Sequence, residues 1–206
     1  MDERVERYSE LLEEDDLETQ TILVVSGASI EEVKAIVLAD AALPADGQTL
    51  QDDEVSAYAF VEVEGGVLAV EPTGYADPSV SALVQLSAGN RRAAVVRDNI
   101  QAHVRFGAAR DGALLFDDDE YIFIGAEQRS RVPDELRPLV DLAWIDVDAD
   151  GGDDEADPVA VALAMAELVT GIVLTAEDFE RLDELPRSAW HGVRTMRYVD
   201  GLADQG

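Results

Sequence analysis

The stretch VSAYAFVEVEGGVLAV, residues 55–70, gives the clearest indication of the fold. It reads as a strand from Val55 to Val63, a two-residue turn at Gly65-Gly66 and a return strand from Val67 to Val70. Branched and aromatic side chains favour strands, and paired glycines favour the tight turns of hairpins. The sequence therefore predicts an antiparallel hairpin here.

Further strands are predicted on both sides of this hairpin, at residues 21–25, 93–96, 102–108, 113–116 and 121–124, with a turn at Asp111-Gly112. Apolar residues at helical spacing predict helices near residues 30–37, 78–88, 135–145, 158–169 and 176–185. Ser29 with Glu32, Asp77-Pro78 and Asp157-Pro158 are the expected helix starts. Because strands come first and helices last, we expect an α+β fold: a mainly antiparallel sheet of about six or seven strands, helices on one face and a helical C-terminal third.

The chain divides by composition into four parts. An acidic N-terminal helix is predicted over residues 1–18 and an α+β core over residues 19–145. An acidic linker follows at residues 146–157, and residues 158–206 form a helical part that we expect to pack on the core. A length of 206 residues suits one well-filled domain with such an appendage.

Charge and cysteine content restrict the classes of function. The 45 Asp and Glu residues against 15 Lys and Arg give a formal net charge of −30, which disfavours direct binding to nucleic acid or to anionic membranes. The absence of cysteine excludes disulfides and thiolate chemistry. With no leader or membrane-spanning pattern, we expect a cytoplasmic protein.

The acidic linker contains one metal-like pattern. Counted from Asp146, oxygen-bearing side chains fall at the first, third, fifth, ninth and twelfth positions, with glycine at the sixth, as in an EF-hand calcium loop. The candidate ligands are Asp146, Asp148, Asp150, Asp154 and Asp157. Asp157 is shorter than the usual glutamate and is also a helix cap, and no second loop is present. A solvated linker is the favoured interpretation, with weak Ca²⁺ binding as the alternative, and no other cofactor is expected.

Five arginines lie close together in the sequence. They are Arg91, Arg92, Arg97, Arg105 and Arg110, and only Asp98 interrupts them with a negative charge. The first four form a possible anion site, since guanidinium groups bind carboxylate and phosphate. The alternative is that the arginines pair with acids across neighbouring strands, which we favour.

No pattern of catalytic residues is present. His103 and His191 lack serine or aspartate partners at a catalytic spacing, and there is no phosphate-binding loop, dinucleotide fingerprint or nucleophile elbow. The run Asp117-Asp-Asp-Glu120 has the chemistry to chelate a metal, but such runs are usually solvated turns. We therefore expect no enzyme activity.

Four landmarks in order carry a family resemblance: Val67-Leu-Ala-Val-Glu-Pro-Thr-Gly74, Leu86-Ser-Ala-Gly89, Asn99-Ile-Gln-Ala102 and Leu168-Val-Thr-Gly-Ile-Val-Leu-Thr175. They resemble a family of unknown function from high-GC Gram-positive bacteria, over roughly residues 18–185. Gln101 stands where that family usually has asparagine, and the acidic linker departs from its pattern. The resemblance implies a fold and a bacterial origin, and it implies no active site.

The function expected from these features is binding to another protein. Small acidic proteins without motifs include bacterial immunity proteins and antitoxins, which occlude a basic partner, and electrostatic steering speeds such capture. The residues expected to contact the partner are Glu10, Glu13, Glu14, Asp15, Asp16, Asp52, Asp53 and Glu54. The alternatives are a calcium-binding module or a nucleic-acid mimic, and the oligomeric state is left open.

Overall fold

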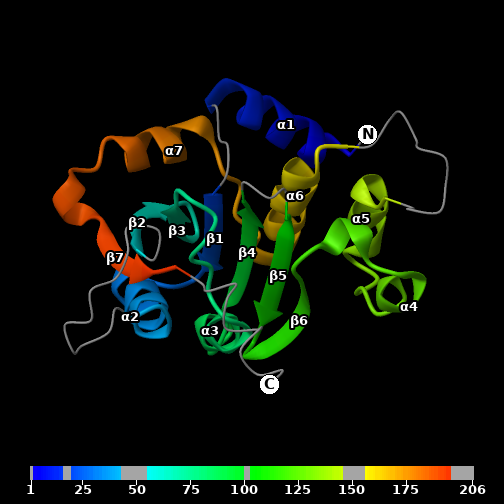
Figure 1. Cartoon of the computed structure of the whole chain (residues 1–206), viewed down its shortest axis with the longest axis horizontal. Coiled ribbons are helices and arrows are strands. Elements are labelled where there is room, and N and C mark those ends of the chain that lie inside the picture. Colours follow the sequence, from blue (N-terminus) through cyan, green and yellow to red (C-terminus); the bar gives the residue numbers. More distant parts are fainter. Residues whose placement is uncertain (1, 16–19, 43–54, 100–102, 146–155, 196–206) are drawn as a thin grey trace, which may run out of the picture.

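A computed structural model describes residues 2–15, 20–42, 55–99, 103–145 and 156–195 (Figure 1). Its helices are α1 (Glu3–Asp15), α2 (Ile30–Asp40), α3 (Val80–Leu86), α4 (Ala126–Arg129), α5 (Arg137–Ala143), α6 (Pro158–Thr170) and α7 (Ala176–Asp183), with short 3₁₀ turns η2 (Tyr121–Phe123) and η3 (Arg187–Ala189). Its strands are β1 (Gln20–Ser26), β2 (Val55–Val63), β3 (Gly66–Glu71), β4 (Arg92–Asp98), β5 (Arg105–Arg110), β6 (Ala113–Asp118) and β7 (His191–Arg194).

The strands form one sheet in the order β6-β5-β4-β1-β3-β2-β7, and every pair in it is antiparallel. The predicted α+β fold is therefore confirmed. β1 lies at the centre, where Leu23 faces Ala69 of β3 and Val95 of β4. All three side chains are buried, as expected for strands covered on both faces.

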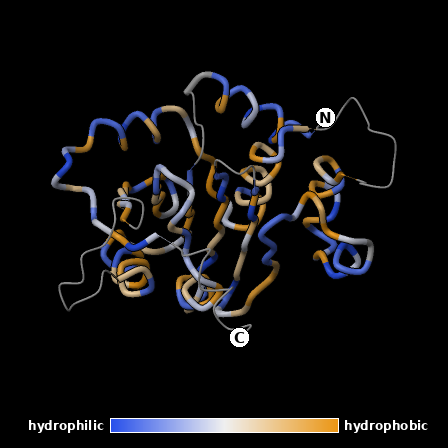
Figure 2. Tube along the Cα trace, viewed as in Figure 1, coloured by the Kyte–Doolittle hydropathy of each residue, from blue (hydrophilic) through white to orange (hydrophobic). Residues whose placement is uncertain are grey.

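Helices cover both faces of the sheet, so the expectation of helices on one face was wrong. Ile22 and Val24 of β1 pack in the core beneath α1, α5 and α6, whereas Leu23 and Val25 pack in a second core beneath α2 and α3. Figure 2 shows apolar residues along the strands of the sheet and along α6. The physical reason is that alternate residues of the central strands are apolar on both sides, and each side needs its own cover.

The C-terminal third contributes both helices and a strand. The apolar helix α6 packs against β4, and α1 packs on α6 from outside. The hydroxyl of Tyr8 links these elements by donating to Glu167 Oε2 of α6 at 2.9 Å and accepting from the N–H of Leu174 at 3.2 Å. β7 then pairs with β2, so the last part of the chain closes one edge of the sheet.

Two local predictions need correction, and a third is confirmed. The hairpin turn is Glu64-Gly65, not Gly65-Gly66: Gly66 already belongs to β3, where an ideal Cβ would lie 2.0 Å from the carbonyl oxygen of Val25. Residues 121–124 contain the 3₁₀ turn η2 in place of a strand, with Tyr121 and Ile122 buried. The Asp111-Gly112 turn is confirmed, and both its residues have positive φ, 53° and 75°.

Candidate functional site

A row of buried polar side chains crosses the sheet at one end of the face covered by α2 and α3. Thr21 lies opposite both Glu71 and Arg97, and Arg97 lies opposite Arg105. Cross-strand partners point to the same side, so these four side chains form one row across β3, β1, β4 and β5. Each is at most 4 % exposed. Two arginines in the apolar interior need compensating charges close by.

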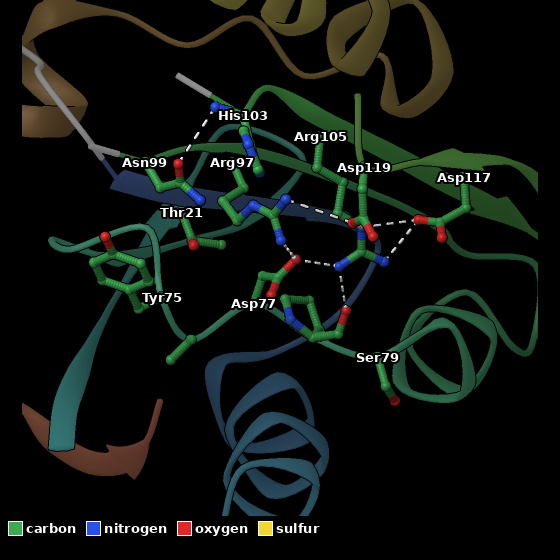
Figure 3. A network of polar contacts seen from close by, with 12 residues as sticks. Thr21, Tyr75, Asp77, Ser79, Arg97, Asn99, His103, Arg105, Asp117 and Asp119 are labelled. Carbon is green, nitrogen blue, oxygen red and sulfur yellow. Dashed lines mark hydrogen bonds and ion pairs between the residues drawn. The ribbon is translucent and has the colours of Figure 1, made fainter. Parts of the chain in front are cut away.

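Asp77 supplies the first of these charges. Its side chain is fully buried, and its Oδ2 accepts from Nη1 of Arg97 at 3.2 Å and from Nη1 of Arg105 (Figure 3). Arg105 also donates to the carbonyl oxygen of Pro78 at 2.8 Å. The helix expected to start at Asp77-Pro78 therefore starts later, at Val80. The cap of α3 is Ser79, whose hydroxyl accepts from the N–H of Ala82.

Asp117 supplies the second charge from the neighbouring strand β6. Its Oδ1 accepts from Nε and Nη2 of Arg105 at 2.9 and 2.6 Å. This approach depends on Gly107, where an ideal Cβ would lie 2.5 Å from the same oxygen. Burial raises the pKa of Asp117, and Arg105 only partly opposes the shift. Burial would lower the pKa of Arg105, but the carboxylates of Asp77 and Asp117 outweigh it and the net shift is upward.

A loop folded over the end of the sheet delivers Asp77 to the arginines, and the buried carboxylate of Glu71 holds this loop. The donors to Glu71 are the N–H groups of Thr73, Tyr75 and Ala76, at 2.9 to 3.2 Å, and the hydroxyls of Thr21, Ser56 and Thr73. Gly74, with φ of 67°, lies so close to β4 that an ideal Cβ would be 2.0 Å from the carbonyl oxygen of Asp98. Glu71 thus fixes the path of residues 72–77.

An acidic hollow opens beside this cluster. It has a volume of about 510 Å³ and is lined by His103, Asp117, Asp118, Asp119 and Glu120. Asp119 is 71 % exposed and lies 3.5 Å from Nη2 of Arg97 and 3.8 Å from Nε of Arg105 (Figure 3). His103 Nε2 lies 3.3 Å from Glu120 Oε1. Burial raises the pKa of Asp118. The hollow offers carboxylate acceptors to a cationic group.

The structure brings together only two of the four arginines of the predicted anion site. Arg97 and Arg105 are adjacent, but Asp77 and Asp117 already pair with them. Arg91 and Arg92 lie at the other end of β4, where Arg91 bonds Glu32 and the carbonyl of Ala88, and Arg92 bonds the carbonyl of Val169. Arg110 pairs with Glu135. Of the charge pairs that we expected across neighbouring strands, the described residues contain one, between Arg105 of β5 and Asp117 of β6. The partners of Arg91, Arg97 and Arg110 are acids outside the sheet.

Most of the predicted calcium ligands, Asp146, Asp148, Asp150 and Asp154, lie outside the described residues. Asp157 is described, and its Oδ1 accepts from the N–H groups of Val159 and Ala160 as the cap of α6. Within the described ranges, no group of three or more acidic or histidine side chains is placed to hold a metal ion. Calcium binding stays a prediction.

The predicted partner-binding residues fall into two groups. Glu10 and Glu13 are exposed on α1. Glu14 and Asp15 are the last residues of the same helix, but their side chains are not described. The other predicted contact residues lie outside the described residues: Asp16, Asp52, Asp53 and Glu54.

Sequence reasoning missed Glu71, Asp77 and Asp117 as members of a buried cluster. One signal was available, because Arg97 continues the inward alternation of Ala93 and Val95 along β4. An arginine at an inward position requires buried acceptors, which the sequence alone does not locate.

Comparisons with known proteins place the chain in a family without assigning it an activity. Neither the curated proteins nor the solved structures contain a significant match to it. In the part of the chain that the structure describes, no helix is both long and apolar enough to cross a membrane. A family model described as a family of unknown function, DUF6461, matches residues 15–183. This match covers most of the chain, so the protein belongs to the DUF6461 family.

Proposed function

We propose that this protein is a non-catalytic cytoplasmic binding protein that captures a basic protein partner, in the manner of an immunity protein or antitoxin. The net charge of −30 supports a basic partner, because such a field attracts cationic surfaces and repels nucleic acid and other acidic proteins. The observation that carries the proposal is the acidic face formed by α1 and α7.

The two helices contact each other and lie along the same side of the molecule (Figure 1). Both are amphipathic: Val5, Tyr8 and Leu11 of α1 and Phe179 and Leu182 of α7 are buried in the same core. Their outward sides are acidic. The exposed acids are Glu3, Glu6, Glu10, Glu13, Glu177, Glu180, Asp183 and Glu184. We call this surface the α1–α7 face.

The negative charge of this face is uncompensated. The arginines of α1 and α7 are occupied, since Arg4 pairs with Asp2, Arg7 with Glu167 and Arg181 with Asp178. None of the eight exposed acids forms an ion pair with another described residue. Carboxylates left without counter-charges on one surface create a local negative potential, which favours rapid association with a basic surface.

The test compares two variants of equal charge. The first carries Glu10→Gln, Glu13→Gln and Glu180→Gln on the α1–α7 face. The matched control carries Glu31→Gln, Glu62→Gln and Glu64→Gln, which are exposed acids on other surfaces. Tagged full-length chains are incubated with nuclease-treated host lysate at low and moderate salt, and bound proteins are identified by mass spectrometry.

We expect one stoichiometric basic protein that the wild type and the control retain and the α1–α7 variant loses. Its binding should weaken as salt rises, because screening shortens the range of exposed charges. Equal loss in both variants would indicate non-specific attraction, and the absence of any stoichiometric basic protein would contradict the proposal.

A further inference from the structure

The strand β6 forms an open edge of the sheet. Within the described residues, its backbone pairs only with β5, and it is the last strand in the sheet order. The opposite edge differs, because β7 is shorter and the N–H of Arg194 already donates to the carbonyl of Ala41 at 3.0 Å. An open edge strand is a template for pairing with another extended segment.

The hairpin geometry shows which backbone groups are available on this edge. Arg110 and Ala113 flank the two-residue turn whose positive φ angles define type I′, so these two residues exchange backbone hydrogen bonds. Leu114, the next residue, therefore directs its N–H and carbonyl away from β5. The residue is also 44 % exposed, so the edge offers both hydrogen bonds and an apolar contact.

The far end of the same strand determines the charge of a suitable occupant. β6 ends with Asp117 and Asp118 and is followed by Asp119 and Glu120, and all four line the acidic hollow of about 510 Å³. A second copy of this chain would bring another net charge of −30 to this edge. Cationic side chains, in contrast, would find carboxylate acceptors at the end of the strand.

We propose that β6 receives an extended basic segment of a partner protein as an additional strand, with a cationic side chain of that segment in the acidic hollow. Backbone hydrogen bonds along β6 supply affinity, and the hollow supplies selectivity for lysine or arginine. This inference rests on the proposed function for the charge of the partner. It adds a contact surface separate from the α1–α7 face.

The test uses a short synthetic peptide of alternating arginine and valine, acetylated and amidated, titrated into the full chain and followed by backbone amide resonances. An analogue methylated on alternate backbone nitrogens has the same charge but cannot pair as a strand. We expect the peptide to shift the resonances of residues 113–120. The methylated analogue should bind at least about tenfold more weakly, as expected when strand hydrogen bonds are lost.

Two variants locate the site. Leu114→Lys places a cation on the edge and should weaken peptide binding about tenfold, a difference of about 1.4 kcal/mol. Val173→Lys adds the same charge at a residue of similar exposure, 46 %, outside the sheet, and should leave binding unchanged.

Three outcomes would overturn the inference: no binding, equal binding of the methylated analogue, or shifts confined to the α1–α7 face. A dimer that sedimentation detects and that Leu114→Lys dissociates would also overturn it, because a second copy of the chain would then occupy β6. Failure of the peptide with a partner retained through the α1–α7 face would leave the proposed function standing. Peptide binding at β6 without any basic partner in the lysate would support the β6 site and contradict the proposed function.

Discussion

Replacement of Asp77 by asparagine tests the idea that a buried charge cluster holds the end of the sheet together. Asp77 is fully buried and lies between Arg97 and Arg105. Asparagine keeps the size of the side chain and removes its charge. Arg105 would retain Asp117 and the Pro78 carbonyl, whereas Arg97 would retain, among the described residues, only the exposed Asp119 at 3.5 Å.

The expected loss of stability follows from this geometry. Removing one partner of a buried ion pair costs about 3 to 5 kcal/mol, because the remaining charge is left uncompensated. In a domain of this size, each kcal/mol shifts the melting temperature by about 2 to 4 °C, so Asp77→Asn should lower it by roughly 6 to 20 °C. Urea unfolding followed by circular dichroism gives the free energy, and calorimetry gives the melting temperature.

Two further variants separate this mechanism from a general effect of mutation. Arg97→Met in the Asp77→Asn background removes the uncompensated guanidinium and should recover at least about 1 kcal/mol. Glu127→Gln breaks the exposed pair with Arg131 and should cost less than about 1 kcal/mol. A loss for Asp77→Asn as small as that for Glu127→Gln would refute the reasoning. A double variant less stable than Asp77→Asn alone would refute it equally.

Other predictions follow from neighbouring contacts. Glu71→Gln replaces an acceptor surrounded by donors with an amide that also donates, and should lower the free energy of unfolding by about 2 to 3 kcal/mol in urea titrations. Gly107→Ala places a methyl group against Asp117 and should cost about 1 to 3 kcal/mol, measured in the same way. Asp157→Ala removes the cap of α6 and should lower the melting temperature by the equivalent of about 1 kcal/mol. Burial raises the pKa of Tyr58 well above its ordinary value of 10.0. The unfolded chain ionises this group first, so stability should fall as pH rises above about 10, with tyrosinate absorbance appearing together with loss of circular dichroism.

The fold could be predicted from the sequence wherever one local rule was sufficient. Alternation located the hairpin of β2 and β3, and the capping pairs located α2 and α6. The sequence failed where tertiary contacts override a local preference. Asp77-Pro78 has the form of a helix start, but Asp77 compensates two buried arginines and Ser79 takes its place as the cap.

The candidate site was harder to predict because its members come from five separate places in the chain. Glu71 lies at the end of β3, Asp77 in the following loop, Arg97 and Arg105 on neighbouring strands, and Asp117 on β6. Abundant acids also hide the few that are buried, since no sequence rule separates Asp117 from the exposed Asp119.

The buried and exposed charges of this protein have different physical roles. Asp77 and Asp117 compensate two guanidinium groups in the interior, where an unpaired charge is costly, so their place in the structure explains why they are charged. The exposed acids of the α1–α7 face have no such explanation. Their mutual repulsion opposes the compact state, and solubility needs far less than a net charge of −30. A basic partner would relieve this repulsion, so its binding should also stabilise the fold, and a melting temperature that rises with partner concentration is the thermodynamic consequence.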